Sequence, residues 1–224
     1  MPETEDESVF KVGANCWRRE TARQAAVAID GESYYRALRE TIIAARHRVM
    51  ILGWDIHSKL RLVRDETDDG LPVELGALLD HVASKQSVDV YLLSWDFAMI
   101  YLLEREAFPS YTFDSKTHSR VRFKLDGAHP RGASQHQKLV VIDDSVAFCG
   151  GIDLSQWRWD SSEHLPDDER RVDPAGNTYQ PFHDLQMAVD GDAAAALAVL
   201  ARERWRRATG WWRGCGSACL SAGE

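Results

Sequence analysis

Short apolar runs alternate with stretches of helical periodicity along most of the chain. Residues 48–54 and 88–95 are almost continuously apolar, which is typical of strands buried on both faces. Between such runs, apolar residues recur three or four positions apart, as in amphipathic helices. The pattern predicts strands at 25–29, 48–54, 88–95, 121–126 and 184–191, and helices at 31–47, 72–85, 96–106 and 193–207, the last capped by Asp192. This order favours an α/β layered sandwich with a mixed, mostly parallel sheet and helices on both faces.

Two further segments interrupt this order. Residues 134–151 read as a tight antiparallel hairpin whose turn is Asp144-Ser145. Residues 157–183 form a long polar loop with three prolines, and a loop of that length is usually functional or disordered. We therefore expect a flexible acidic segment at 1–24, one folded lobe at 25–209 and an irregular tail at 210–224.

Composition and charge narrow the class of protein. The 224 residues are 44% apolar and 28% charged, an ordinary globular balance, and 35 acidic against 27 basic residues give a net charge of −8. Bulk electrostatics therefore favours neither non-specific binding to DNA nor binding to anionic membranes, although a local basic patch could still bind either. We find no secretory signal and no apolar run long enough to span a membrane, and we expect a cytoplasmic protein. Four cysteines are too few for a disulfide framework, and Cys215 and Cys219 read as ordinary tail residues rather than a zinc pair.

An arginine- and tryptophan-rich cluster occupies residues 202–213. It has two interpretations, a membrane-surface element or the solvated end of a helix with one aromatic packed inward. The first would bring the protein to the membrane periphery.

The strongest chemical signal is His136-Gln-Lys138 followed by four residues and then Asp143. Two positions apart on a strand, the imidazole and the ammonium would project from the same face. Together they suit a phosphate group, because imidazole can attack phosphorus and lysine can hold anionic oxygens. Asp143 ends the predicted strand, where a carboxylate can accept hydrogen bonds from neighbouring backbone. The competing interpretation is a buried hairpin with the histidine and lysine at its edge.

A glycine pair follows the first motif closely. Gly150 and Gly151, with Asp153 two positions later, would let the backbone approach a ligand and present free N–H donors. We take these three residues as candidates for substrate binding.

The pattern HxKxxxxD followed by GGxD resembles the signature of the phospholipase D superfamily, the HKD phosphodiesterases. The segments ILGWD (51–55), NCWR (15–18) and PFHDLQMAVDG (181–191) also resemble the first lobe of bacterial phospholipases D, so the likeness covers about residues 14–209. It implies that His136 attacks a phosphodiester to form a phosphohistidine, while a second histidine protonates the leaving alcohol. Water or another alcohol would then release the phosphate.

The resemblance also implies roles for the other candidates. Lys138 would neutralise the developing charge, Asp143 would hold the motif's architecture, and Asp184 would orient the nucleophilic imidazole. This chemistry needs no metal or other cofactor. His183, next to Asp184, is expected near the site. The remaining histidines show no ligand spacing and are taken as background: His47, His81, His118, His129 and His164.

The chain departs from the family pattern because it has one HKD motif where two are needed. A near match begins at His57, but its aspartate, Asp65, comes one residue late, and a half-exposed strand explains the segment better. The second motif would come from a homodimer partner or from a second lobe lost by truncation near Gly210, and we favour truncation. The expected function is phospholipid hydrolysis or transphosphatidylation. The alternatives are a homodimeric HKD nuclease and a catalytically silent half-enzyme.

Overall fold

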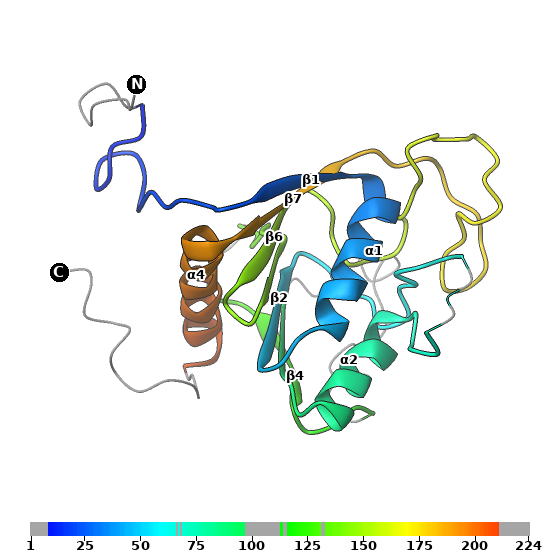
Figure 1. The fold of residues 1–224 in the computed structure, drawn as a ribbon, viewed down its shortest axis with the longest axis horizontal. Coiled ribbons are helices and arrows are strands. Elements are labelled where there is room, and N and C mark those ends of the chain that lie inside the picture. The colour runs from blue at the N-terminus through cyan, green and yellow to red at the C-terminus, as the bar shows by residue number, and fades with distance from the viewer. Residues whose placement is uncertain are drawn as a thin grey trace.

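A seven-stranded sheet with helices on both faces organises the chain (Figure 1). The structure is a computed structural model that describes residues 9–65, 67, 69–96, 113, 116–130 and 133–210. Its strands are β1 (Ala25–Ile29), β2 (Arg48–Gly53), β3 (Asp89–Trp95), β4 (Val121–Asp126), β5 (Leu139–Ile142), β6 (Val146–Gly150) and β7 (Leu185–Asp190). Its helices are α1 (Asp30–Ile43), α2 (Leu75–Lys85) and α4 (Gly191–Thr209). The helix predicted at 96–106 lies almost wholly outside the described residues.

The strands lie in the order β1-β7-β6-β5-β2-β3-β4. Only the β2–β3 and β3–β4 pairs are parallel, and the other four neighbouring pairs are antiparallel. The α/β class and the mixed sheet are therefore confirmed, whereas the expectation of mostly parallel pairing is wrong. The reason is the β5–β6 hairpin, because strands joined by a tight turn must run in opposite directions, and β7 and then β1 extend that antiparallel half.

Each face of the sheet has its own apolar core. On one face, α1 and α2 bury residues such as Leu38 and Leu78 against the strands. On the other, α4 packs Trp205 edge-on against Tyr91 of β3, with ring centroids 5.0 Å apart. Trp205 is only 1% exposed, so in the described part of the arginine- and tryptophan-rich cluster one aromatic is packed inward. That arrangement matches the helix-end interpretation of the cluster.

Two element boundaries differ from the sequence predictions in ways that matter for the site. The hairpin's first strand begins at Leu139 and not at residue 134, so the histidine and lysine of the motif lie in the segment before it. Helix α4 begins at Gly191, and Asp190 rather than Asp192 stands at its N-cap. The Asp190 carboxylate does not cap the helix, because it accepts hydrogen bonds from the backbone N–H groups of Arg23 and Gln24 at 2.9 and 2.8 Å.

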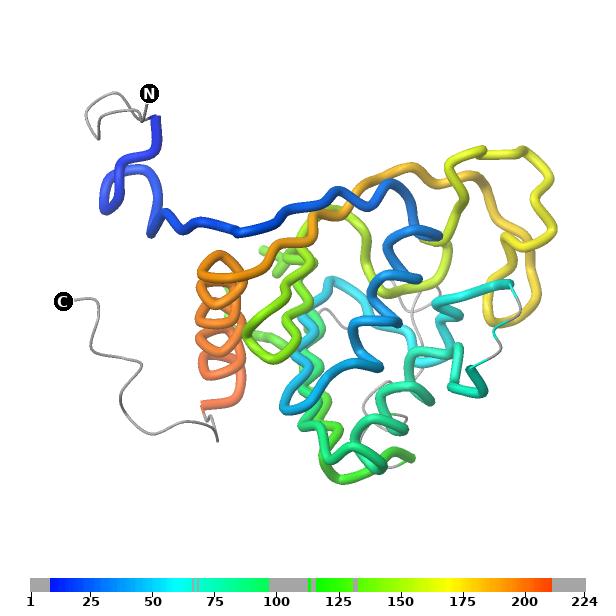
Figure 2. Tube along the Cα trace, viewed as in Figure 1, coloured from blue at the N-terminus to red at the C-terminus, as the bar shows by residue number. Residues whose placement is uncertain are grey.

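The loop at 157–183 packs against the beginning of α1 (Figure 2). The backbone at Arg158 and Trp159 comes so close to Gly31 that any side chain at position 31 would overlap it. Asp160 and Arg171 form an ion pair of 2.9 Å inside this loop, with side chains 0% and 1% exposed. Burial raises the pKa of Asp160, but hydrogen bonds from His164, the backbone and Arg171 outweigh it, so the pKa lies below its usual value. The loop is thus held by buried polar contacts.

At one edge of the sheet, strands that end there lie beside strands that begin there. The strands β1, β2, β3, β4 and β6 end there, while β5 and β7 begin there. We call this the site edge, because it gathers the segments at 53–55, 136–138, 150–153 and 184 beside Asp30. Within the described ranges, no helix is long and apolar enough to cross a membrane.

Candidate active site

His136 is exposed at the site edge, in the extended segment that leads into β5. Its ring forms a T-shaped contact with the ring of Trp54, with centroids 6.2 Å apart, and Trp54 stacks on Trp95 at 5.6 Å. The indole N–H of Trp95 in turn donates to Nε2 of His129 at 3.0 Å. The imidazole of His136 is therefore exposed to solvent beside the stacked rings of Trp54 and Trp95, which we call the aromatic wall.

Lys138 is buried, although it lies only two residues from His136. Its Nζ is 3.2 Å from Oδ2 of Asp153, and the two side chains are 6% and 4% exposed. The same Nζ donates to the carbonyl oxygen of His136 at 3.4 Å. The expectation that His136 and Lys138 lie side by side on a strand is not met, because β5 begins only at Leu139. Instead, Lys138 ties the backbone of the histidine to the buried aspartate.

Asp153 connects three parts of the site edge. Its Oδ1 accepts the backbone N–H of Trp54 at 2.9 Å, and its carbonyl oxygen accepts the hydroxyl of Tyr35 at 2.6 Å. Burial raises the pKa of Tyr34 far above its ordinary value, and the negative charge of Asp153 raises it further. Asp153 was expected to bind substrate, and the structure places it in the interior that positions Lys138 and Trp54.

The glycine pair makes room for β7. A side chain at Gly151 would overlap the carboxylate of Asp184, and one at Gly150 would overlap Gln186 and the backbone of Leu185. The space expected for a close ligand is thus filled by the protein's own residues. What the glycines secure is the position of Asp184 at the site edge.

Asp184 is half-buried and fixed by its neighbours. Its Oδ1 accepts the N–H of Leu185 at 2.7 Å, and its backbone exchanges hydrogen bonds with Asp30, whose N–H donates to the Asp184 carbonyl at 2.9 Å. Among the described residues, no hydrogen bond joins Asp184 to His136. The orienting role of Asp184 therefore stays a prediction.

Asp143 lies at the opposite end of β5 from His136. Seven residue steps separate them, roughly 23 Å of extended chain at about 3.3 Å per residue. Its carboxylate accepts the backbone N–H groups of Arg46, His47 and Arg48 at 2.7, 2.8 and 2.7 Å. This aspartate anchors the α1–β2 connection to the hairpin, in keeping with an architectural role.

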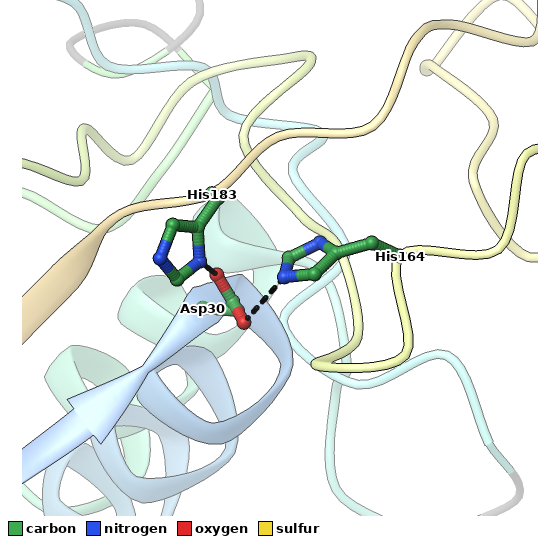
Figure 3. A group of neighbouring side chains, drawn as sticks. All are labelled: Asp30, His164 and His183. Atoms are coloured by element: carbon green, nitrogen blue, oxygen red, sulfur yellow. Dashed lines mark hydrogen bonds and ion pairs between the residues drawn. The ribbon is translucent and has the colours of Figure 1, made fainter.

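Two histidines gather beside Asp184 at Asp30 (Figure 3). His183, expected near the site, has Nδ1 2.7 Å from Oδ1 of Asp30. His164, taken as background, has Nε2 3.3 Å from Oδ2 of the same carboxylate. Sequence reasoning missed this group because Asp30 begins α1, whereas the two histidines lie more than 130 residues later, at positions 164 and 183 of the long loop. Only the HD dipeptide at 183–184 hinted at it.

Comparisons with known proteins agree on one family. A family model described as Phospholipase D matches residues 41–216. Phospholipase D B of Dictyostelium discoideum is 29% identical over 211 residues, covering 80% of this chain and 17% of its own length. Phospholipase D delta of Arabidopsis thaliana is 31% identical over 225 residues, covering 76% and 26%. The chain thus spans only about a sixth and a quarter of the lengths of these two curated relatives.

Solved structures show the same fold at low identity. Nuc from Salmonella typhimurium, described as a phospholipase D family member, superposes with a TM-score of 0.50 at 14% identity, covering 82% of this chain and 96% of Nuc. NucT from Helicobacter pylori gives 0.53 at 14% identity, covering 82% and 98%. The lobe described above is therefore nearly the whole of each of those chains.

Proposed function

The chain belongs to the phospholipase D family, and on that premise we propose that it supplies the nucleophilic histidine of a phosphodiesterase acting on phospholipids. The observation that carries the proposal is His136, an exposed imidazole in a motif whose other members are locked in place. A nucleophile must reach its substrate, whereas the groups that position it must not move.

In the proposed reaction, a ring nitrogen of His136 attacks phosphorus and the bond to the leaving alcohol breaks. A second histidine, which this lobe does not supply, gives that alcohol its proton. Water then gives one proton to the second histidine and attacks the phosphohistidine, so that the P–N bond breaks and both rings return to their starting state. An alcohol in place of water would give transphosphatidylation.

Lys138 has two roles in the proposed reaction. Its charge helps to neutralise the anion that develops at phosphorus, as the family resemblance implies. Its contacts with Asp153 and with the His136 carbonyl make it a positioning residue for the nucleophile as well. Asp184, beside Gly151, is proposed to orient the imidazole.

The near match at His57 does not supply the second histidine. Its side chain is buried at the loop after β2, and its Nδ1 accepts the backbone N–H of Lys59 at 3.2 Å. The backbone N–H of His57 donates to the Leu154 carbonyl. The half-exposed strand expected there is absent from the described residues 57–65, which form a loop with one isolated bridge at Arg61. The proton donor must then come from a second lobe or a second copy.

An exposed apolar strip beside the site edge is the surface that we propose this partner covers. Val27 and Ile29 of β1 lie opposite Met187 and Leu185 of β7, and all four side chains are 40–59% exposed. Contiguous apolar surface of this kind is typical of interfaces.

Three observations favour lipid over nucleic acid. The net charge of −8 opposes a polyanion, and the curated relatives are named phospholipases D. The aromatic wall of Trp54 and Trp95 next to His136 also suits a substrate with an apolar or cationic part.

A substrate with an activated leaving group tests this chain by itself. Bis(4-nitrophenyl) phosphate releases nitrophenolate, which needs no proton donor, so attack by His136 alone is visible. We expect a stoichiometric burst of nitrophenolate and a nitrophenylphosphoryl adduct on His136 by peptide mass spectrometry. The burst should vanish in His136→Asn and persist in His81→Asn, a matched histidine of α2 far from the site edge.

Natural substrates then separate the alternatives. Choline release from phosphatidylcholine vesicles, lost in His136→Asn, supports the lipid proposal, whereas plasmid nicking without vesicle hydrolysis would replace lipid by nucleic acid. A folded chain that forms no adduct and hydrolyses neither substrate would leave the catalytically silent half-enzyme as the correct account.

A further inference from the structure

Asp30, His164 and His183 come together next to the site edge from three separate parts of the chain (Figure 3). One ligand atom from each lies within 4.8 Å of the others. The proposed phosphodiester chemistry uses none of the three.

The carboxylate of Asp30 is fully buried, and its two oxygens face different histidines. Oδ1 lies 2.7 Å from Nδ1 of His183 and also accepts the N–H of Asp184 at 3.3 Å. Oδ2 accepts no hydrogen bond among the described residues, although Nε2 of His164 is 3.3 Å away. A buried carboxylate oxygen in that state is costly unless a cation compensates it.

His164 stands between two carboxylates. Its Nδ1 is 3.1 Å from Oδ2 of Asp160, and its Nε2 faces Asp30. A neutral imidazole has one N–H, so when Nδ1–H donates to Asp160, Nε2 turns a lone pair toward Asp30. Two lone pairs facing each other call for a positive centre between them. In metal sites, a ligating histidine usually donates the N–H of its other ring nitrogen to a carboxylate, and Asp160 occupies that position beside His164.

We propose that Asp30, His164 and His183 bind one divalent transition-metal ion of the Zn²⁺ class. Two imidazole nitrogens and one carboxylate oxygen are a common three-ligand set for zinc, with a fourth position left for water. Asp160, held by Arg171, is the positioning residue that fixes the ring of His164.

The spacing suits such an ion with a small adjustment. Ligand atoms about 2.0–2.1 Å from a tetrahedral zinc are about 3.3 Å apart. The His164–Asp30 separation is 3.3 Å already, and the His183–Asp30 separation of 2.7 Å must widen by roughly 0.6 Å. The side chain of His183 is 67% exposed, so its ring can turn outward and water can reach the fourth position.

The site would brace the edge that carries Asp184. The Asp30 N–H donates to the Asp184 carbonyl, and the Asp184 N–H donates to the Asp30 carboxylate. An ion that binds Asp30, His164 and His183 therefore joins the beginning of α1 to two distant positions in the long loop. This inference does not depend on the reaction proposed for His136.

Metal binding to the full chain tests the proposal directly. The chain is stripped with a chelator, then titrated with Co²⁺ followed by visible absorption, and with Zn²⁺ in competition with a chromogenic chelator. We expect one ion per chain and ligand-field bands of four- or five-coordinate cobalt. Saturating Zn²⁺ should raise Tm by roughly 5–10 °C.

Four variants decide where the ion binds. His183→Asn and His164→Asn should each weaken binding by at least ~100-fold, and Asp160→Asn by about 10–100-fold, because ligand removal costs more than loss of the supporting partner. His81→Asn is the matched control and should bind as the wild type does. Because the ring of His183 is mostly exposed, His183→Asn should keep the Tm of the metal-free chain, so that lost binding is not lost folding.

Two results would overturn the proposal. One is a wild-type chain that retains neither ion. The other is binding that survives His183→Asn and His164→Asn but disappears in a Cys215→Ser/Cys219→Ser variant, which would assign the ion to those thiols.

Discussion

The buried pair of Lys138 and Asp153 offers the sharpest test of how the motif is held together. Their charged atoms are 3.2 Å apart, with side chains 6% and 4% exposed. At that distance, and with an effective dielectric constant of about 20, their Coulomb attraction is about 5 kcal/mol. Much of that attraction offsets the cost of taking both charges out of water, so the pair adds little net stability. Removing one partner, in contrast, leaves the other charge buried and uncompensated.

Lys138→Met should therefore lower the free energy of unfolding by about 3–5 kcal/mol. For a chain of this size the corresponding fall in Tm is roughly 6–20 °C. Urea unfolding followed by circular dichroism measures the change, with m-values compared to verify that the unfolded states are equivalent. Lys124→Met, at an exposed lysine of β4, is the matched control and should change stability by no more than about 0.5 kcal/mol.

A double-mutant cycle separates the pair from the loss of a side chain. Asp153→Asn alone should also destabilise, while the Lys138→Met/Asp153→Asn double variant should be more stable than the sum of the two single losses by about 2–3 kcal/mol. A cost below about 1 kcal/mol for Lys138→Met, or a cycle without coupling, would refute the reasoning. Either result would mean that solvent screens the two charges and that Lys138 is not held by Asp153.

Two further changes test polar contacts elsewhere in the fold. Asp143→Ala removes the acceptor of three backbone N–H groups, and urea unfolding should show a free energy of unfolding lower by about 2–4 kcal/mol. Asp143→Asn should cost about half as much, because asparagine tolerates the left-handed backbone at φ 52°. Equal costs for the two variants would contradict the anchoring role. On α4, hydrogen bonds from Arg206 and then Arg207 lower the pKa of Glu203 to about 2, so their stabilisation is complete above about pH 4.5 and is lost as the pH falls toward 2. At pH 7, calorimetry should therefore show a lower Tm for Glu203→Gln than for the wild type, by no more than the equivalent of ~1 kcal/mol. Near pH 2 the two Tm values should be equal. A Tm difference that grows as the pH falls would contradict the stabilising effect assigned to the ionised carboxylate.

Local pattern determined much of this protein. The apolar runs and helical spacings predict every strand of the sheet and its three described helices, because burial on one or both faces leaves a periodic trace in the sequence. The motif from His136 to Asp143 and the glycine pair at 150–151 also stand out in the sequence. They identify the family before any contact is known.

Only the tertiary structure decided how these parts meet. The fold made four of the six strand pairings antiparallel. It also placed the last residues of five strands and the first residues of two at the site edge. It sent Lys138 inward to Asp153, filled the space at Gly151 with Asp184, and joined Asp30 to histidines more than 130 residues away. Periodicity reports which side of an element is buried, but the partner of each polar group depends on which distant segments share an edge. That choice is made by the packing of the whole sheet.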